Sequence, residues 1–110
     1  MDRIIRGLLY VVLTAVLGRV TFNGHYETYY NLNMSNIVIR AHDNGIDGAY
    51  WIDEKGIKRF DEYVIVAADW SIHPYGSLVE TSHGTGIVLD TGDFIKDHPE
   101  DIDIATSWEE

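Results

Sequence analysis

Residues 64–69 read Val-Ile-Val-Ala-Ala-Asp, an apolar run that ends in an acid. Two similar stretches follow, Ile-Val-Leu-Asp-Thr-Gly at 87–92 and Ile-Asp-Ile-Ala at 102–105. Apolar runs this short, bounded by turn residues, are typical of buried β-strands. An acid at the rim of a buried strand is costly to desolvate, so it usually needs a partner or a function. The sequence therefore predicts a sheet with Asp69, Asp90 and Asp103 at the edges of its strands.

These three aspartates suggest acid–base chemistry if the fold brings them together. Carboxylates at close range repel one another, which pushes the pKa of at least one of them up toward neutrality, as a general acid requires. Taken singly, Asp69 and Asp90 are more readily interpreted as turn residues, because an Asp side chain can hydrogen-bond to the backbone of its own turn. Their order and context favour the catalytic interpretation for the set.

The remaining chain divides into short elements separated by turns. The aromatic-rich stretch His25–Tyr30 predicts a strand. Apolar residues between Met34 and Ala41 have the spacing of an amphipathic helix, with Ser35 as its N-cap and Gly45 as its stop. Further strands are expected at 49–53, 56–60, 78–81 and 86–90, the first two as a hairpin. Many short strands with one or two short helices predict a mainly β fold, a small β-barrel.

Composition excludes several classes of function. The 110-residue chain is long enough for one domain, and it carries a net charge of −10 with a pI near 4.7. No basic stripe is present, so no nucleic-acid partner is expected. The chain has no cysteine, which rules out disulfides and thiolate zinc sites. Its five histidines are scattered without an H-E-x-x-H pattern, so neither a metal nor a cofactor is expected.

The first 20 residues have two interpretations. Arg3 and Arg6 precede an apolar stretch from Leu8 to Leu17, and Arg19 follows it. A basic flank before a short apolar core is typical of a secretory signal or signal anchor, although an ordinary buried element fits as well. Residues 21–110 then form the folded domain, and membrane contact is expected only through the N-terminal segment.

Residues 64–105 resemble the three-aspartate domain family of bacterial cell-wall lytic enzymes. Successive aspartates are 21 and 13 positions apart, from 69 to 90 and from 90 to 103. The motifs that carry the resemblance are Ala67-Ala68-Asp69, Ile72-His73-Pro74-Tyr75-Gly76, Leu89-Asp90-Thr91-Gly92, Phe94-Ile95-Lys96 and Ile102-Asp103-Ile104. The resemblance implies a six-stranded double-psi β-barrel.

The same resemblance implies a peptidoglycan lytic transglycosylase, which cleaves the MurNAc–GlcNAc β-1,4 bond and leaves a 1,6-anhydro sugar. One carboxyl suffices for this reaction because the nucleophile is the sugar's own C6 hydroxyl, whereas ordinary glycosidases need two carboxylates. By resemblance Asp103 is the acid/base, Asp90 raises its pKa, and Asp69 holds the loop or the sugar. The expected substrate-binding residues are Trp70, Thr91, Gly92 and Lys96. Glycan strands are then the partner, and the protein is extracytoplasmic, at the cell wall, or phage-borne.

Two other classes stay open. A non-catalytic cell-wall-binding or phage structural module would keep the barrel for its shape alone. Leu89-Asp90-Thr91-Gly92 also matches the active-site motif of aspartic proteases, in which two carboxylates share a proton. Only 20 residues, 91–110, follow Asp90, whereas the protease fold builds most of its barrel after the motif.

Overall fold

The computed structural model describes residues 20–22 and 24–109. The apolar segment expected at residues 1–20 therefore lies outside the described residues, except for its last position. Within the described part, no helix is long and apolar enough to cross a bilayer.

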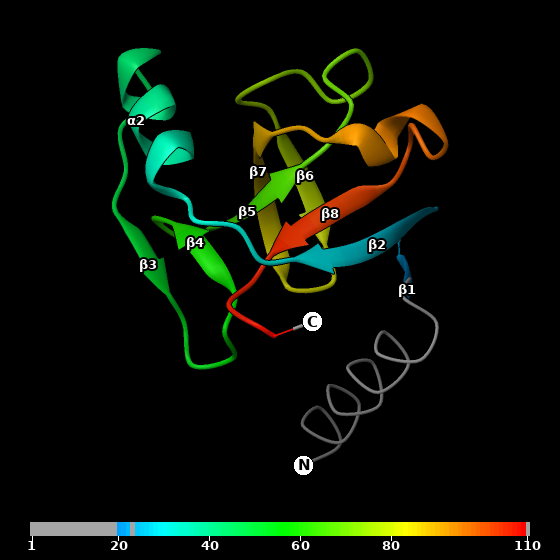
Figure 1. The fold of residues 1–110 in the computed structure, drawn as a ribbon, viewed down its shortest axis with the longest axis horizontal. Helices are drawn as coiled ribbons and strands as arrows, with labels where there is room; N and C mark the ends of the chain where they lie inside the picture. Colours follow the sequence, from blue (N-terminus) through cyan, green and yellow to red (C-terminus); the bar gives the residue numbers. More distant parts are fainter. Residues whose placement is uncertain (1–19, 23, 110) are drawn as a thin grey trace.

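Eight strands, one α-helix and one 3₁₀-helix make up the described fold, as Figure 1 shows. The helices are α2 (Ser35–Asp43) and η1 (Asp93–Lys96). The strands are β1 (Val20–Phe22), β2 (His25–Tyr30), β3 (Tyr50–Ile52), β4 (Lys58–Phe60), β5 (Tyr63–Ala67), β6 (Leu78–Thr81), β7 (Gly84–Asp90) and β8 (Ile102–Ala105). The prediction of a mainly β fold with one or two short helices is confirmed.

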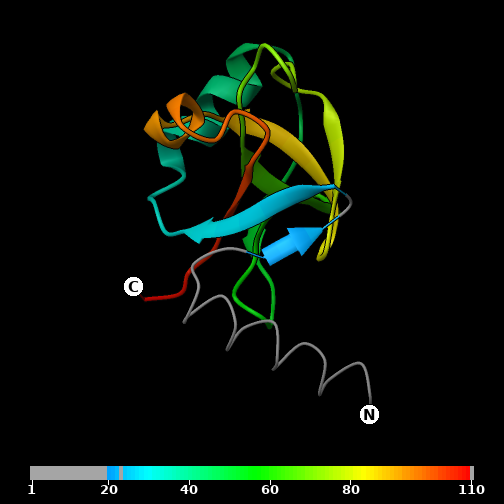
Figure 2. The ribbon, with the colours of Figure 1, turned by 90° about the vertical axis from the view of Figure 1, so that its right-hand side faces the viewer.

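Strand β5 is the centre of a mixed sheet. One edge of β5 pairs in parallel with β7, which carries β6 as an antiparallel neighbour. The other edge pairs antiparallel with β4 near Val64 and with β8 near Val66. Strand β2 adds in parallel to β8, and Figure 2 shows it crossing the molecule beside β1. Segments far apart in sequence therefore meet along β5 and β8.

The predicted closed, six-stranded barrel is wrong. The sheet has eight strands, and among the described strands the order β1-β2-β8-β5-β4-β3 does not return on itself. Hairpins explain the open edges: β1 folds back on the outer edge of β2, and β3 folds back on the outer edge of β4. Each hairpin occupies an edge that closure would need. Strand β1 itself was not expected from the sequence.

Both faces of the central strands are buried, which explains why their sequences are nearly continuous apolar runs. Alternate residues of β5 point to opposite faces. Ile65 packs in a cluster beneath α2, and Val64 and Val66 pack in a second cluster on the other face. The first cluster contains Met34, Ile37, Ala41, Phe60, Ile65, Ile87, Leu89 and Ala105. The second contains Ile57, Val64, Val66, Ala68, Val88, Ile102 and Ile104.

The predicted helix forms, but its N-terminal cap differs from the prediction. Met34 occupies the cap position, and Ser35 is the first helical residue, so the assignment of Ser35 as N-cap is wrong. The backbone N–H of Ser35 instead donates to the side-chain oxygen of Asn33 at 2.9 Å. At the other end Gly45 adopts φ +80°, the left-handed conformation that ends many helices, as predicted.

Candidate functional site

Asp90 and Asp103 lie on either side of Ala67 in the sheet. Ala67 pairs with Asp90 on β7 and with Asp103 on β8. Cross-strand partners point to the same face, and neighbouring strands are about 4.8 Å apart, so the two aspartate backbones are separated by roughly 10 Å. The structure therefore brings two of the three predicted catalytic aspartates together on one face.

A β-bulge places Asp90 on this face. Val66 pairs with Val88, and the next residue of β5, Ala67, pairs with Asp90 rather than Leu89. The β7 strand thus contains one extra residue at this point. In a regular strand with the same residues, alternation would instead turn Asp90 toward the face of Val88, which belongs to the second cluster.

Two hydroxyls from β2 hold the carboxylates. The phenol of Tyr30 donates to Oδ2 of Asp90 at 2.9 Å, and the hydroxyl of Thr28 donates to Oδ1 of Asp103 at 2.8 Å. The parallel pairing of β2 with β8 sets Thr28 directly opposite Asp103 and Tyr30 opposite Ala105. The backbone N–H of Thr91 supplies a further hydrogen bond to Oδ1 of Asp90.

Tyr30 responds electrostatically to both aspartates. Burial raises the pKa of its phenol far above the ordinary value, and the charge of Asp90, the hydrogen bond to Asp90 and the charge of Asp103 raise it further. Tyr30 therefore keeps its proton and acts as a fixed donor toward the pair. Asp90 is 8% exposed and Asp103 is half-buried, so the site lies at the boundary of the core.

Asp69 has a different environment. Its Oδ1 accepts hydrogen bonds from the hydroxyl and the backbone N–H of Ser71, at 2.7 and 2.9 Å. The Asp69 carbonyl accepts from the N–H groups of Ile72 and His73. The Ser71 hydrogen bonds lower the pKa of the Asp69 carboxyl, and the nearby His73 lowers it further. Asp69 is thus an ionised turn residue that begins the loop after β5.

Trp70 contacts the aspartate site through its indole nitrogen. Its Nε1 donates to the carbonyl oxygen of Asp90 at 3.0 Å, and its ring meets the ring of Tyr75 edge-on, with centroids 5.1 Å apart. The side chain is 37% exposed. The role of Trp70 as a platform for a sugar ring stays a prediction.

The other predicted substrate-binding residues follow β7. Thr91 is exposed and Gly92 half-buried, directly after Asp90. Lys96 is exposed at the end of η1. Figure 1 shows η1 at the same end of the sheet as α2, on the opposite side of β7. Thr91 and Gly92 form the chain segment that leaves Asp90, and no hydrogen bond from the Lys96 side chain to an aspartate is found among the described residues.

Sequence reasoning missed Tyr30 and Thr28 as site residues. Both lie in the aromatic-rich strand that was correctly predicted, but their partners are 60 and 75 positions away in the chain. A hydroxyl at every second position, Thr28 and Tyr30, was the available signal that one face of β2 is polar.

The described residues offer a hydrogen-bonded carboxylate pair rather than a metal centre. No group of three or more His, Cys, Asp or Glu side chains suited to hold a metal occurs among them. Two surface grooves lie beside the site rather than over it. One is bounded by α2 and the β3–β4 hairpin, and the other lies near His25 and His98. A carboxyl group in such a pair can donate or accept a proton.

Comparisons with known proteins add no assignment. No family model matches the chain, and no curated protein or solved structure matches it either.

Proposed function

We propose that this protein is a peptidoglycan lytic transglycosylase whose acid/base is Asp103. The observation that carries the proposal is that Asp90 and Asp103 both pair with Ala67, from the two neighbouring strands. Tyr30 on β2 is affected by the charges of both aspartates. The order of the aspartate motifs, which resembles that of the three-aspartate family, supports the same function.

In the proposed reaction Asp103 starts protonated and donates its proton to the glycosidic oxygen. The bond from that oxygen to C1 of MurNAc breaks, and the C6 hydroxyl oxygen of the same sugar bonds to C1. Asp103 then accepts the proton that leaves the C6 hydroxyl, so the carboxyl is restored and no water is consumed. Asp90, held by Tyr30 and the Thr91 N–H, contributes the negative charge that favours a proton on Asp103.

The glycan substrate would contact residues close to Asp90 as well as the aspartates themselves. Trp70 is 37% exposed and its indole is fixed by a hydrogen bond to the Asp90 carbonyl, which suits stacking on a sugar. Thr91 and Gly92 would bind the glycan through the segment after β7, and Lys96 would meet its anionic groups. Asp69 would keep the Trp70 loop in place through its hydrogen bonds to Ser71. A wall-directed substrate would place the protein outside the cytoplasm or on a phage.

The direct test is incubation with purified peptidoglycan, followed by mass spectrometry for anhydro-muropeptides. We expect such products from the wild-type protein and none from Asp103→Asn. Hydrated muropeptides instead of anhydro forms would contradict the mechanism, because they require water as nucleophile. Cleavage of a peptide library without any glycan product would instead support the protease alternative.

A non-catalytic wall-binding or phage structural module is the second candidate, and one observation favours it. Asp90 is 8% exposed and its carboxylate is already bonded to Tyr30 and to the Thr91 N–H. Neither of the two grooves is lined by the aspartate pair. Sedimentation with intact cell walls in the absence of any released product, for wild type and Asp103→Asn alike, would identify this function.

A further inference from the structure

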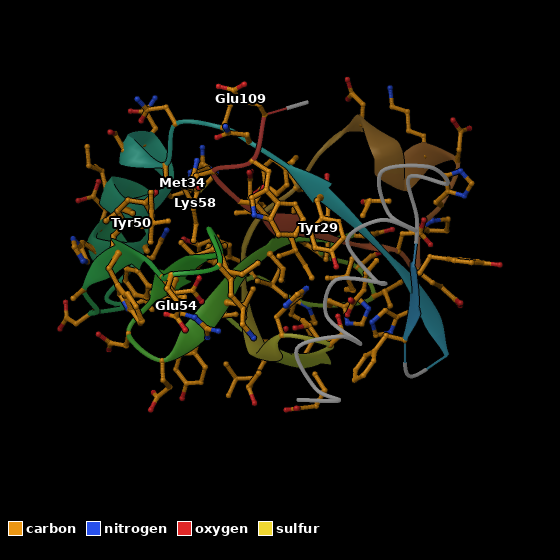
Figure 3. All side chains as sticks on the ribbon, turned by 90° about the horizontal axis from the view of Figure 1, so that it is seen from below. Tyr29, Met34, Tyr50, Glu54, Lys58 and Glu109 are labelled. Atoms are coloured by element: carbon orange, nitrogen blue, oxygen red, sulfur yellow. The ribbon has the colours of Figure 1, made fainter. Side chains whose placement is uncertain are left out.

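A surface groove of about 610 Å³ lies between α2 and the β3–β4 hairpin. Its walls are largely apolar, formed by Met34, Val38, Ile39, Tyr50 and Ile52. Figure 3 shows Met34, Lys58 and Tyr50 in this region, beside α2 and the hairpin. A volume of this size is within the range of small-molecule sites, about 300–1,000 Å³.

Large apolar side chains on both walls are open to solvent. Ile39 on α2 is 57% exposed, Ile52 on β3 is 47% exposed and Tyr50 is 38% exposed. Single exposed apolar residues are common on protein surfaces, but facing ones across a groove mark a place for an apolar ligand. The two walls therefore favour a ligand with a hydrocarbon body.

Lys58 supplies a buried positive charge to the same groove. It lines the groove and is only 5% exposed. Its ammonium donates to two neutral oxygens, Oδ1 of Asn31 at 2.8 Å and the carbonyl of Leu32 at 2.6 Å. Among the described residues no carboxylate pairs with it, although the chain carries a net charge of −10. A buried ammonium without a counter-ion is costly, and burial lowers the pKa of Lys58 accordingly.

The N-terminus of α2 adds to this positive end. Met34 and Ser35, at the start of the helix, line the groove, and the first turn contains no acidic residue. The first N–H, that of Ser35, already donates to Asn33, and the helix dipole at such a terminus favours an anion. One end of an apolar groove thus combines a buried ammonium with a helix start that carries no acidic residue in its first turn.

We propose that this groove binds an acyl carboxylate, with the hydrocarbon chain along Ile39 and Ile52 and the carboxylate against Lys58. The carboxylate would take the third ammonium hydrogen of Lys58 and replace the missing counter-ion. The proposal does not depend on the aspartate pair, since the groove shares no lining residue with Asp90, Asp103 or Tyr30.

Matched ligands test the proposal on the full chain. Decanoate, decanol and acetate are titrated into the protein below any micelle concentration, and binding is followed by calorimetry and by the NMR methyl signals of Ile39 and Ile52. We expect decanoate to bind about tenfold or more tightly than decanol, since a charge-assisted hydrogen bond in a covered site contributes that much. Acetate should bind too weakly to measure. Equal binding of decanoate and decanol, or no binding of decanoate, would overturn the proposal.

Two lysine variants distinguish the contribution of the ligand's carboxylate from that of its hydrocarbon. Lys58→Met should weaken the binding of decanoate about tenfold or more and leave the binding of decanol unchanged. Lys55→Met, which replaces an exposed lysine outside the groove, should change the affinity for neither ligand. Wild-type affinity for decanoate in Lys58→Met would contradict the assigned head position.

A second variant keeps the test decisive should Lys58→Met fail to fold. Ile39→Glu replaces an exposed side chain, so the fold should persist while the added charge abolishes decanoate binding. Leu78→Glu, equally exposed but on β6, serves as its control. A peptide with a C-terminal valine carboxylate, compared with its amide, is the last arm: binding of the peptide acid without decanoate binding would replace the acyl ligand by a protein C-terminus.

Discussion

The phenol of Tyr30 donates a 2.9 Å hydrogen bond to Oδ2 of Asp90 from a strand 60 positions earlier in the chain. The two residues are on strands that do not pair with each other, because β8 and β5 lie between β2 and β7. The bond therefore joins the two sides of the face on which Asp103 also lies.

Replacing Tyr30 by Phe should destabilise the protein by about 1–3 kcal/mol, because a buried carboxylate loses a donor and gains nothing in return. Urea unfolding at neutral pH measures the change. Tyr50→Phe is the control, since the Tyr50 phenol makes no hydrogen bond among those found in the described residues, and it should change stability by less than about 0.5 kcal/mol. A Tyr30→Phe protein as stable as wild type would mean that Asp90 does not depend on this donor.

Asp103→Asn should lower the rate of anhydro-muropeptide release by a factor of about 100 or more, the usual contribution of a general acid/base. The fold should persist, because Thr28 can donate to the amide oxygen as it does to Oδ1. Circular dichroism checks the fold, and Asp97→Asn, an exposed loop acid, is the matched control. Near wild-type release from Asp103→Asn, with loss in Asp90→Asn, would move the acid/base role to Asp90.

The ion pair between Asp53 and Arg59 predicts a pH-dependent contribution to stability. Arg59 Nε lies 2.7 Å from Oδ2 of Asp53. Burial acts to raise the pKa of Asp53, but the hydrogen bonds from Arg59 and from the N–H groups of Ile57 and Lys55 outweigh it, and the net pKa is lowered. Because the pKa of Asp53 is lower in the folded state than in the unfolded state, where it is near about 3.9, the ionised carboxylate stabilises the fold at pH values above the unfolded-state pKa. This stabilisation is lost as the pH falls through the folded-state pKa.

Asp53→Asn should therefore cost about 1 kcal/mol at neutral pH, and the difference from wild type should shrink only below about pH 4. Denaturant unfolding between about pH 3 and about pH 7 measures it. The Asn side-chain oxygen can still accept the backbone hydrogen bonds, so the variant removes the charge and the acceptor for Arg59 Nε but keeps the turn contacts. Glu54→Gln, an exposed acid of the same turn, should give a pH-independent difference near zero. A constant Asp53→Asn difference across this range would exclude the ion pair as its source.

Gly48→Ala should destabilise the fold by about 1–3 kcal/mol through overpacking. A Cβ at position 48 would lie 2.4 Å from Cε2 of Phe60, which is 1% exposed in the cluster beneath α2. Thermal or urea unfolding measures the loss, and Asp47→Ala next to it should be nearly neutral. Adding Phe60→Leu to Gly48→Ala should cost less than the sum of the two single changes, because the smaller side chain removes the clash. Simple additivity would contradict this explanation.

Local sequence patterns predicted most of the strands. Strands β2, β6 and β8 form over the predicted residues, and β5 forms along the apolar run that precedes Asp69. Their apolar or aromatic runs are short and bounded by turns, so the information is contained in a few neighbouring residues. Closure of the sheet is different, because it depends on which edges the β1 and β3 hairpins occupy.

The site was predictable only in part, for the same reason. Asp90 and Asp103 were identified from their motifs, and both lie on one face of the sheet. Asp69 was identified in the same way, but its carboxylate accepts hydrogen bonds within its own turn. The donors Thr28 and Tyr30 come from a distant strand, and their register with β8 is set by tertiary packing. No local pattern in 87–92 indicates that β7 contains a bulge.

The extra residue in β7 lets two consecutive side chains, those of Leu89 and Asp90, lie on the same side of the sheet. Deleting Leu89 would restore regular alternation and leave Asp90 opposite Ala67, on the face of Tyr30, but it would remove a fully buried side chain from the cluster beneath α2. The bulge therefore adds one apolar side chain to the core without moving Asp90 from its pairing with Ala67.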